Sequence, residues 1–67
     1  MKWTRKVVDG RAAWYSGSFK VVRLGLNAGF QTYQVGQRNG KKLWVPVGFG
    51  SYSLSAAKEL CLSMEDS

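Results

Sequence analysis

The sequence predicts an α+β fold in which a three-stranded antiparallel β-meander packs on one C-terminal α-helix. Two observations predict it. Residues 18–47 alternate strand-length runs rich in Val, Tyr, Phe and Trp with turns that contain glycine. Near the C-terminus, apolar residues recur every three or four positions, which is the helical period. We expect one domain of 67 residues, with an N-terminal hairpin or arm (1–17), the meander (18–47), the helix (53–64) and a tail (65–67).

The N-terminal segment contains a hairpin signal. In "VVDGRA", Asp9-Gly10 stands between short apolar stretches, a pattern typical of a tight turn between two strands. A short hairpin from Trp3 to Tyr15 would extend the sheet. The alternative is an arm that becomes ordered on binding.

The meander is predicted from three strand-length runs and the two turns between them. The runs are Ser18 to Leu26, Phe30 to Gln37 and Lys41 to Val47, and the turns are Asn27-Ala28-Gly29 and Arg38-Asn39-Gly40. The only proline, Pro46, has no backbone N–H to donate. We therefore expect its strand at an edge of the sheet, or its nitrogen facing outward.

The length of the second turn sets which side chains share a face. A two-residue turn at Asn39-Gly40 would pair Val35 with Trp44 and place apolar side chains on both faces of the sheet. A three-residue loop with Gly40 in the left-handed conformation would instead pair Val35 with Leu43. We prefer the three-residue loop because it separates apolar from polar side chains better.

The preferred register, with the same loop at Asn27-Ala28-Gly29, assigns each strand residue to a face. We expect these residues to face the helix: Phe19, Val21, Tyr33, Val35, Leu43, Val45 and Val47. We expect these to face outward: Lys20, Val22, Leu24, Thr32, Gln34, Lys42 and Trp44. Arg23 is the conflict, since it falls on the helix side and would have to reach the edge.

The helix is predicted from a cap and an apolar stripe. Ser53 or Ser55 can accept a hydrogen bond from a free N–H of the first turn. The stripe consists of Leu54, Ala57, Leu60, Cys61 and Met64. It should cover the apolar face of the meander, so we interpret Cys61 as a buried small hydrophobic residue rather than a reactive thiol.

The charge distribution indicates an anionic partner. The formal net charge is +6, and residues 10–58 contain no acidic residue but most of the lysines and arginines. Such a stretch carries a positive field that attracts a polyanion or an acidic protein surface. The alternative is a basic protein whose charges serve only solubility.

The residue inventory argues against catalysis. The chain has no histidine and one cysteine, and Asp9 is its only acidic residue before Glu59. We therefore expect no catalytic residue, no metal site and no cofactor. The single cysteine, the absence of a signal-peptide pattern and the absence of a long apolar run favour a cytoplasmic protein without a membrane partner.

The outward face is the candidate binding surface, with Arg38 and Lys41 at the nearby hairpin tip. The candidate nucleic-acid contacts are Lys20, Gln34, Arg38, Lys41, Lys42 and Trp44. Lysine and arginine contact phosphates, glutamine reads base edges, and tryptophan packs on a sugar or a base. The alternative interpretations are that Trp44 packs on the N-terminal segment, and that the lysines are solvated and protect an edge strand.

The segment "YQVGQRNGKKLWVPVGFGSYSLSAAKEL", read as strand, turn, strand, turn and capped helix, resembles the AP2 domain and the arm-binding domains of phage and transposon integrases. Gly50, Tyr52, Ser53 and the Ala56-Ala57 helix start match their pattern. The resemblance implies double-stranded DNA bound in the major groove by Lys20, Arg38, Lys42 and Trp44. The first strand has fewer outward arginines than such domains use, and no recombinase catalytic domain follows.

The leading functional prediction is a small DNA-binding protein without enzymatic activity, derived from a phage or mobile element and acting in the host-cell cytoplasm. The chain also resembles small phage accessory proteins that bind and block host proteins. The alternative is therefore a protein-interaction module, such as an inhibitor or regulator, whose basic and apolar face binds an acidic protein or forms a homodimer.

Overall fold

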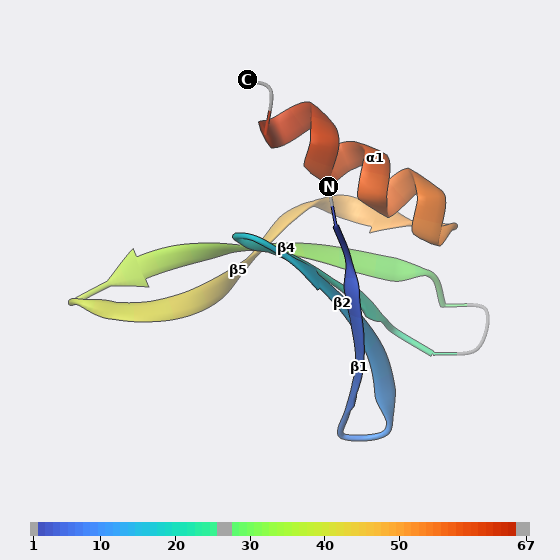
Figure 1. The fold of residues 1–67 in the computed structure, drawn as a ribbon, viewed down its shortest axis with the longest axis horizontal. Coiled ribbons are helices and arrows are strands. Elements are labelled where there is room, and N and C mark those ends of the chain that lie inside the picture. The colour runs from blue at the N-terminus through green and yellow to red at the C-terminus, as the bar shows by residue number, and fades with distance from the viewer. Residues whose placement is uncertain (1, 26–27, 66–67) are drawn as a thin grey trace.

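The computed structural model describes residues 2–25 and 28–65, and it contains a five-stranded antiparallel sheet and one helix (Figure 1). The elements are β1 (Thr4–Val8), β2 (Arg11–Ser16), β3 (Phe19–Arg23), β4 (Phe30–Arg38), β5 (Lys41–Ser51) and α1 (Leu54–Glu65). Consecutive strands are neighbours, in the order β1-β2-β3-β4-β5. The predicted α+β class is confirmed, but three strands understate the sheet because the N-terminal hairpin belongs to it. Pro46 lies on an edge strand, as expected.

The turn between β4 and β5 has two residues, so our preference for a three-residue loop is wrong. Arg38 pairs with Lys41, and Asn39 and Gly40 have φ values of 54° and 78°. Positive φ at both central residues is the turn geometry that matches the right-handed twist of paired strands. The same geometry recurs at Asp9-Gly10, where φ is 53° and 77°.

The predicted three-residue loop at Asn27-Ala28-Gly29 is wrong as well, because Arg23 pairs with Phe30 and six residues therefore connect β3 to β4. Together the two connections reverse the predicted facing of β4. Thr32 pairs with Val21 and Gln34 with Phe19, so both polar residues lie on the side of the sheet that carries the helix. Tyr33, and with it Val35, lies on the opposite side. A slip of one residue moves every side chain of a strand to the other face, and this is why the predicted and observed faces of β4 differ. The assignments on β3 and β5 stand, while Leu26 and Asn27 lie outside the described residues.

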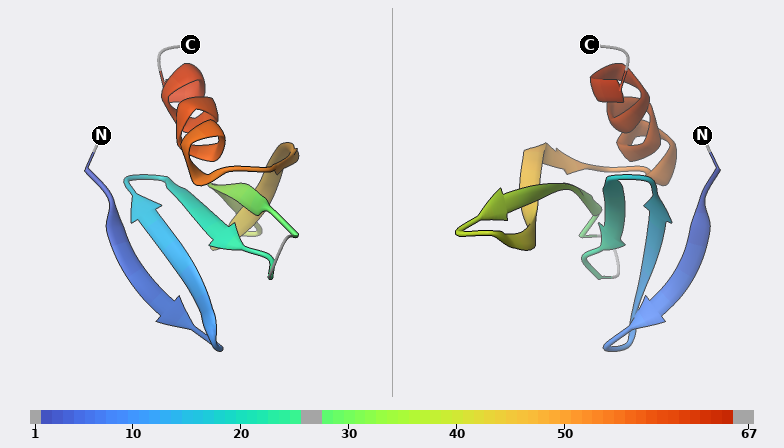
Figure 2. Two further views of the ribbon diagram at one scale, coloured as in Figure 1. Left: turned by 90° about the vertical axis from the view of Figure 1, so that its right-hand side faces the viewer. Right: turned by 60° about the vertical axis from the view of Figure 1, so that its left-hand side comes forward.

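The helix covers one face of the sheet and forms the core with it (Figure 2). Phe19 and Val21 of β3 are buried against Ala57 and Cys61 of α1. Partly buried apolar side chains surround them: Trp3, Trp14, Phe30, Leu54 and Met64. The predicted apolar stripe of the helix and the burial of Cys61 are confirmed. The neighbour of Cys61 on β4 is Thr32, however, and not Tyr33.

The start of the helix is capped as the sequence predicts. The Ala56 N–H donates to Ser53 Oγ at 3.1 Å, and the Ala57 N–H donates to the Ser53 carbonyl at 3.2 Å. These bonds satisfy donors that the first helical turn leaves free. Because the cap follows directly on β5, it fixes where the chain leaves the sheet to cross its face.

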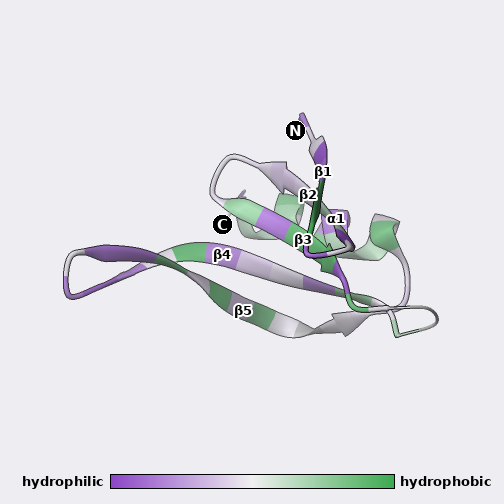
Figure 3. Cartoon of the chain, turned by 90° about the horizontal axis from the view of Figure 1, so that it is seen from below, coloured by the Kyte–Doolittle hydropathy of each residue, from purple (hydrophilic) through white to green (hydrophobic). Residues whose placement is uncertain are grey.

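The face of the sheet away from α1 is called here the open face. By register it carries Lys6, Val8, Arg11, Ala13, Tyr15, Lys20, Val22, Tyr33, Val35, Lys42 and Trp44. In Figure 3 the β4–β5 hairpin ends in a hydrophilic tip, while β5 is hydrophobic nearer its middle. Within residues 2–25 and 28–65, no helix is long and apolar enough to cross a membrane.

Candidate nucleic-acid interface

Basic residues from four strands meet on the open face. Lys6 comes from β1, Arg11 from β2, Lys20 from β3 and Lys42 from β5. Alternation along each strand places these side chains away from the helix. Of the acidic residues that the structure describes, Asp9 alone lies at this face, because Glu59 and Glu65 belong to α1. The open face therefore has an excess of positive charge.

Two aromatic rings contact one of these cations, and a third ring packs against one of the two. The Lys20 ammonium lies 5.1 Å from the centroid of the Tyr33 ring and 4.9 Å from that of the Trp44 ring. The Trp44 ring in turn meets the Tyr15 ring edge to face, with centroids 6.1 Å apart. We call Tyr15, Lys20, Tyr33 and Trp44 the aromatic–lysine cluster. Its contacts lie within the range of cation–π and aromatic pair interactions.

The cluster requires a curved sheet. Tyr15, Lys20 and Tyr33 are successive partners across β2, β3 and β4, whereas Trp44 lies two residues from Pro46, the partner of Tyr33 on β5. In a flat sheet β2 and β5 would be roughly 14 Å apart, three times the usual strand spacing. The 6.1 Å separation of the Tyr15 and Trp44 rings shows that β2 and β5 curl toward the open face.

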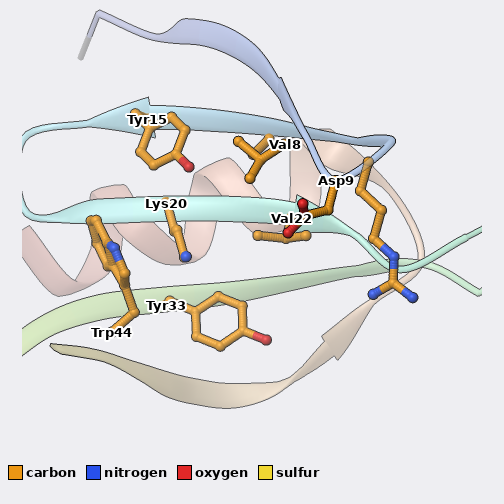
Figure 4. A pocket seen from close by; sticks show the side chains of 9 residues that line it. Val8, Asp9, Tyr15, Lys20, Val22, Tyr33 and Trp44 are labelled. Atoms are coloured by element: carbon orange, nitrogen blue, oxygen red, sulfur yellow. The ribbon is translucent and has the colours of Figure 1, made fainter.

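The curl creates a hollow beside the cluster (Figure 4). Its volume is about 600 Å³, within the roughly 300–1,000 Å³ of small-molecule sites in proteins. The lining residues are Val8, Asp9, Arg11, Ala13, Tyr15, Lys20, Val22, Tyr33 and Trp44. Figure 4 shows their side chains on the side of the sheet opposite the helix. The hollow thus combines flat rings, an apolar floor and charged groups of both signs.

The structure brings together only part of the predicted site. Lys20 and Trp44 are in the cluster, and exposed Lys42 lies on the same face by register. Arg38 and Lys41 flank the turn at the hairpin tip and are exposed. Gln34 was placed wrongly, because it pairs with Phe19 and Val45 on the helix side.

The site also contains three residues that the sequence did not indicate as members: Arg11, Tyr15 and Tyr33. Tyr33 was assigned to the core by the three-residue loop, although Asn39-Gly40 is by itself a strong signal for a two-residue turn. Tyr15 and Arg11 were not considered because an N-terminal arm remained an alternative to a hairpin. Trp44 satisfies both interpretations offered for it, since it lies on the open face and also contacts Tyr15.

The single thiol lies on the other side of the sheet from this site. Cys61 is completely buried, and burial raises the pKa of its thiol above the ordinary value of 9.0, partly opposed by the neighbouring Thr32 hydroxyl. The Thr32 hydroxyl is also buried and makes no hydrogen bond of ordinary geometry among the described residues. In the same part of the chain, no cluster of three or more His, Cys, Asp or Glu residues could hold a metal ion.

Comparisons with known proteins found no relative of this chain. No protein-family model matches the chain, and neither a curated protein nor a solved structure matches it significantly.

Proposed function

We propose that the protein binds DNA through the open face of its sheet, with the duplex as the form that the AP2 resemblance implies. The observation that carries this proposal is that cations and aromatic rings share the one face of the sheet that the helix leaves uncovered. Lysine and arginine neutralise phosphates and supply most of the affinity for DNA. Flat aromatic side chains add contacts to sugars and bases.

The distribution of charge supports the same ligand. Lys6, Lys20 and Lys42 come from different strands and are spread across the sheet, which suits a partner with regularly spaced negative charges. Arg38 and Lys41 pair at the hairpin tip on the other face by register, so they would add to the positive field around the open face rather than to contacts on it. The protein acts in this proposal by binding alone, in the cytoplasm of a host cell, as a product of a phage or mobile element.

A second candidate function is binding to an acidic protein. It is favoured by the apolar area beside the cations, where Val8 is 48% exposed and Val22 also lines the hollow. A second copy of the chain is another candidate protein partner, and it would bind at the edge strand β5, where Leu43 and Val45 on the helix side of the sheet are 39% and 43% exposed. Apolar anchors would dominate such an interface, and salt would weaken it little.

The test is fluorescence anisotropy of a labelled random duplex at several salt concentrations, with the protein's mass in solution measured in parallel. DNA binding predicts a linear fall of log affinity with log salt, by about 0.9 for each neutralised phosphate. An absence of binding at low salt would reject the proposal and favour the protein partner.

Two lysine variants locate the surface. Lys42→Ala removes a charge from the open face, and we expect weaker binding and a salt slope lower by about 0.9 if Lys42 contacts one phosphate. Lys58→Ala is the matched control, because Lys58 lies on α1 near Trp3 and its loss changes net charge equally. Equal effects of both variants on the slope would show that DNA does not contact the open face.

A further inference from the structure

We propose that the aromatic–lysine cluster is a binding site for one unpaired base, so that the protein prefers DNA containing an extrahelical nucleotide over a continuous duplex. This inference rests on the proposed function, because it adds a base contact to the phosphate contacts argued above. It concerns Tyr15, Lys20, Tyr33 and Trp44 and the hollow beside them.

The free protein already places a cation over the ring faces of the cluster. The Lys20 ammonium is about equally distant from the centroids of Tyr33 and Trp44, at 5.1 Å and 4.9 Å. It is a single charge on a flexible stem of four carbons, so it can turn away to a phosphate at small cost. The ring faces that it vacates are then free to stack on a base, which exchanges one cation–π arrangement for a larger contact area.

The shape of the hollow selects an unpaired base. Because β2 and β5 curl toward each other, Tyr15 and Trp44 meet over the sheet and bound one end of the cavity. Ala13 is one of the lining residues, and a larger side chain at this position would fill part of the space. A continuous duplex keeps its bases stacked inside and presents only groove edges, whereas an extruded base can enter a hollow of about 600 Å³.

The rim carries groups that can bond to a base edge. Arg11 offers N–H donors and Asp9 offers carboxylate acceptors, and both line the hollow. Asp9 would be unfavourable in a site for phosphates alone, since like charges repel. A base presents donors and acceptors without a net charge, and it is therefore the part of DNA that fits beside this carboxylate.

The experiment compares three labelled duplexes of one sequence: fully paired, with a central one-nucleotide bulge, and with an abasic nucleotide at the bulge. Stacking on an aromatic side chain predicts that the bulged duplex binds about 10-fold more tightly than the paired one. The abasic bulge bends as easily but has no base, so it should bind like the paired duplex. Equal binding of all three duplexes, or an equal gain in affinity from both bulges, would overturn the inference. Binding of the paired duplex would in that case still support the proposed function. Binding of none at low salt would reject both.

Protein variants assign the effect to the cluster. Trp44→Leu should lower the affinity for the bulged duplex more than the affinity for the paired duplex, so that the preference for the bulge is lost. Tyr52→Leu is the matched control, because Tyr52 is fully exposed and does not line the hollow. A second readout needs no variant: 2-aminopurine at the bulge should lose fluorescence on saturation, as it does when stacked on an aromatic ring. Unchanged or increased emission would overturn the inference.

Discussion

The rings of Tyr15 and Trp44 meet edge to face at 6.1 Å although two other strands separate β2 from β5. This contact closes the open face at one end and joins the N-terminal hairpin to the β4–β5 hairpin. Sheets twist by their nature, but a contact between non-adjacent strands requires curvature as well. We therefore expect the pair to stabilise the curved form of the sheet.

A double-mutant cycle tests this coupling. Replacing Tyr15 and Trp44 by leucine, singly and together, should give an interaction free energy of about 0.5–1.5 kcal/mol in urea unfolding, as aromatic pairs do. Tyr52 is the control partner for Trp44, since it is fully exposed. That second cycle should be additive within about 0.3 kcal/mol. Additivity in both cycles would contradict a stabilising role for the ring contact.

Removing the carboxylate of the open face should strengthen binding to a fully paired duplex, in which no base enters the hollow. Asp9→Asn keeps a residue type that tolerates the positive φ of 53° and eliminates one negative charge. For a phosphate roughly 7 Å away in water the gain is about 0.6 kcal/mol, or about threefold in affinity at low salt. Glu59→Gln makes the same charge change on α1. A gain of similar size in both variants would point to net charge rather than to contact at the open face.

The buried hydroxyl of Thr32 should cost stability. Thr32 is 1% exposed and its Oγ1 makes no hydrogen bond of ordinary geometry among the described residues. Thr32→Val keeps the shape of the side chain and removes a buried hydroxyl whose polar neighbour, the Cys61 thiol, forms only weak hydrogen bonds, so we expect a gain of about 1 kcal/mol in the free energy of unfolding. Thr4→Val on the exposed strand β1 should stay within about 0.5 kcal/mol of the unmodified protein. A loss of stability in Thr32→Val would show that the hydroxyl has a favourable partner.

The thiol of Cys61 should make stability depend on pH in the alkaline range. Burial raises its pKa in the folded protein above the ordinary 9.0, so the folded chain holds the proton where the unfolded chain has released it. Its contribution is therefore complete below about pH 9 and decreases as the pH rises through the folded value. Between pH 8 and pH 10, the free energy of unfolding measured in urea should fall less in Cys61→Ala than in the unmodified protein. Equal losses would mean that Cys61 does not contribute.

Local signals in the sequence determined much of the secondary structure. The Ser53 cap, the Ala57 and Cys61 stripe and the turn at Asp9-Gly10 each depend on residues within a few positions of one another. The signals for these features are local in the sequence, so the pattern predicts them. The same holds for the edge position of Pro46, which follows from its missing N–H.

Tertiary packing decided the facing of β4 and therefore the composition of the site. The side chains at most 1% exposed between helix and sheet are small: Val21 and Thr32 of the sheet, and Ala57 and Cys61 of the helix. A tyrosine in place of Thr32 would hold the helix away from the sheet, so burying the polar but small residue allows the closer packing. Tyr33 is then left for the open face. Strand periodicity alone cannot weigh side-chain volume against polarity across a contact between a sheet and a helix, and that balance is set only when the helix is in place.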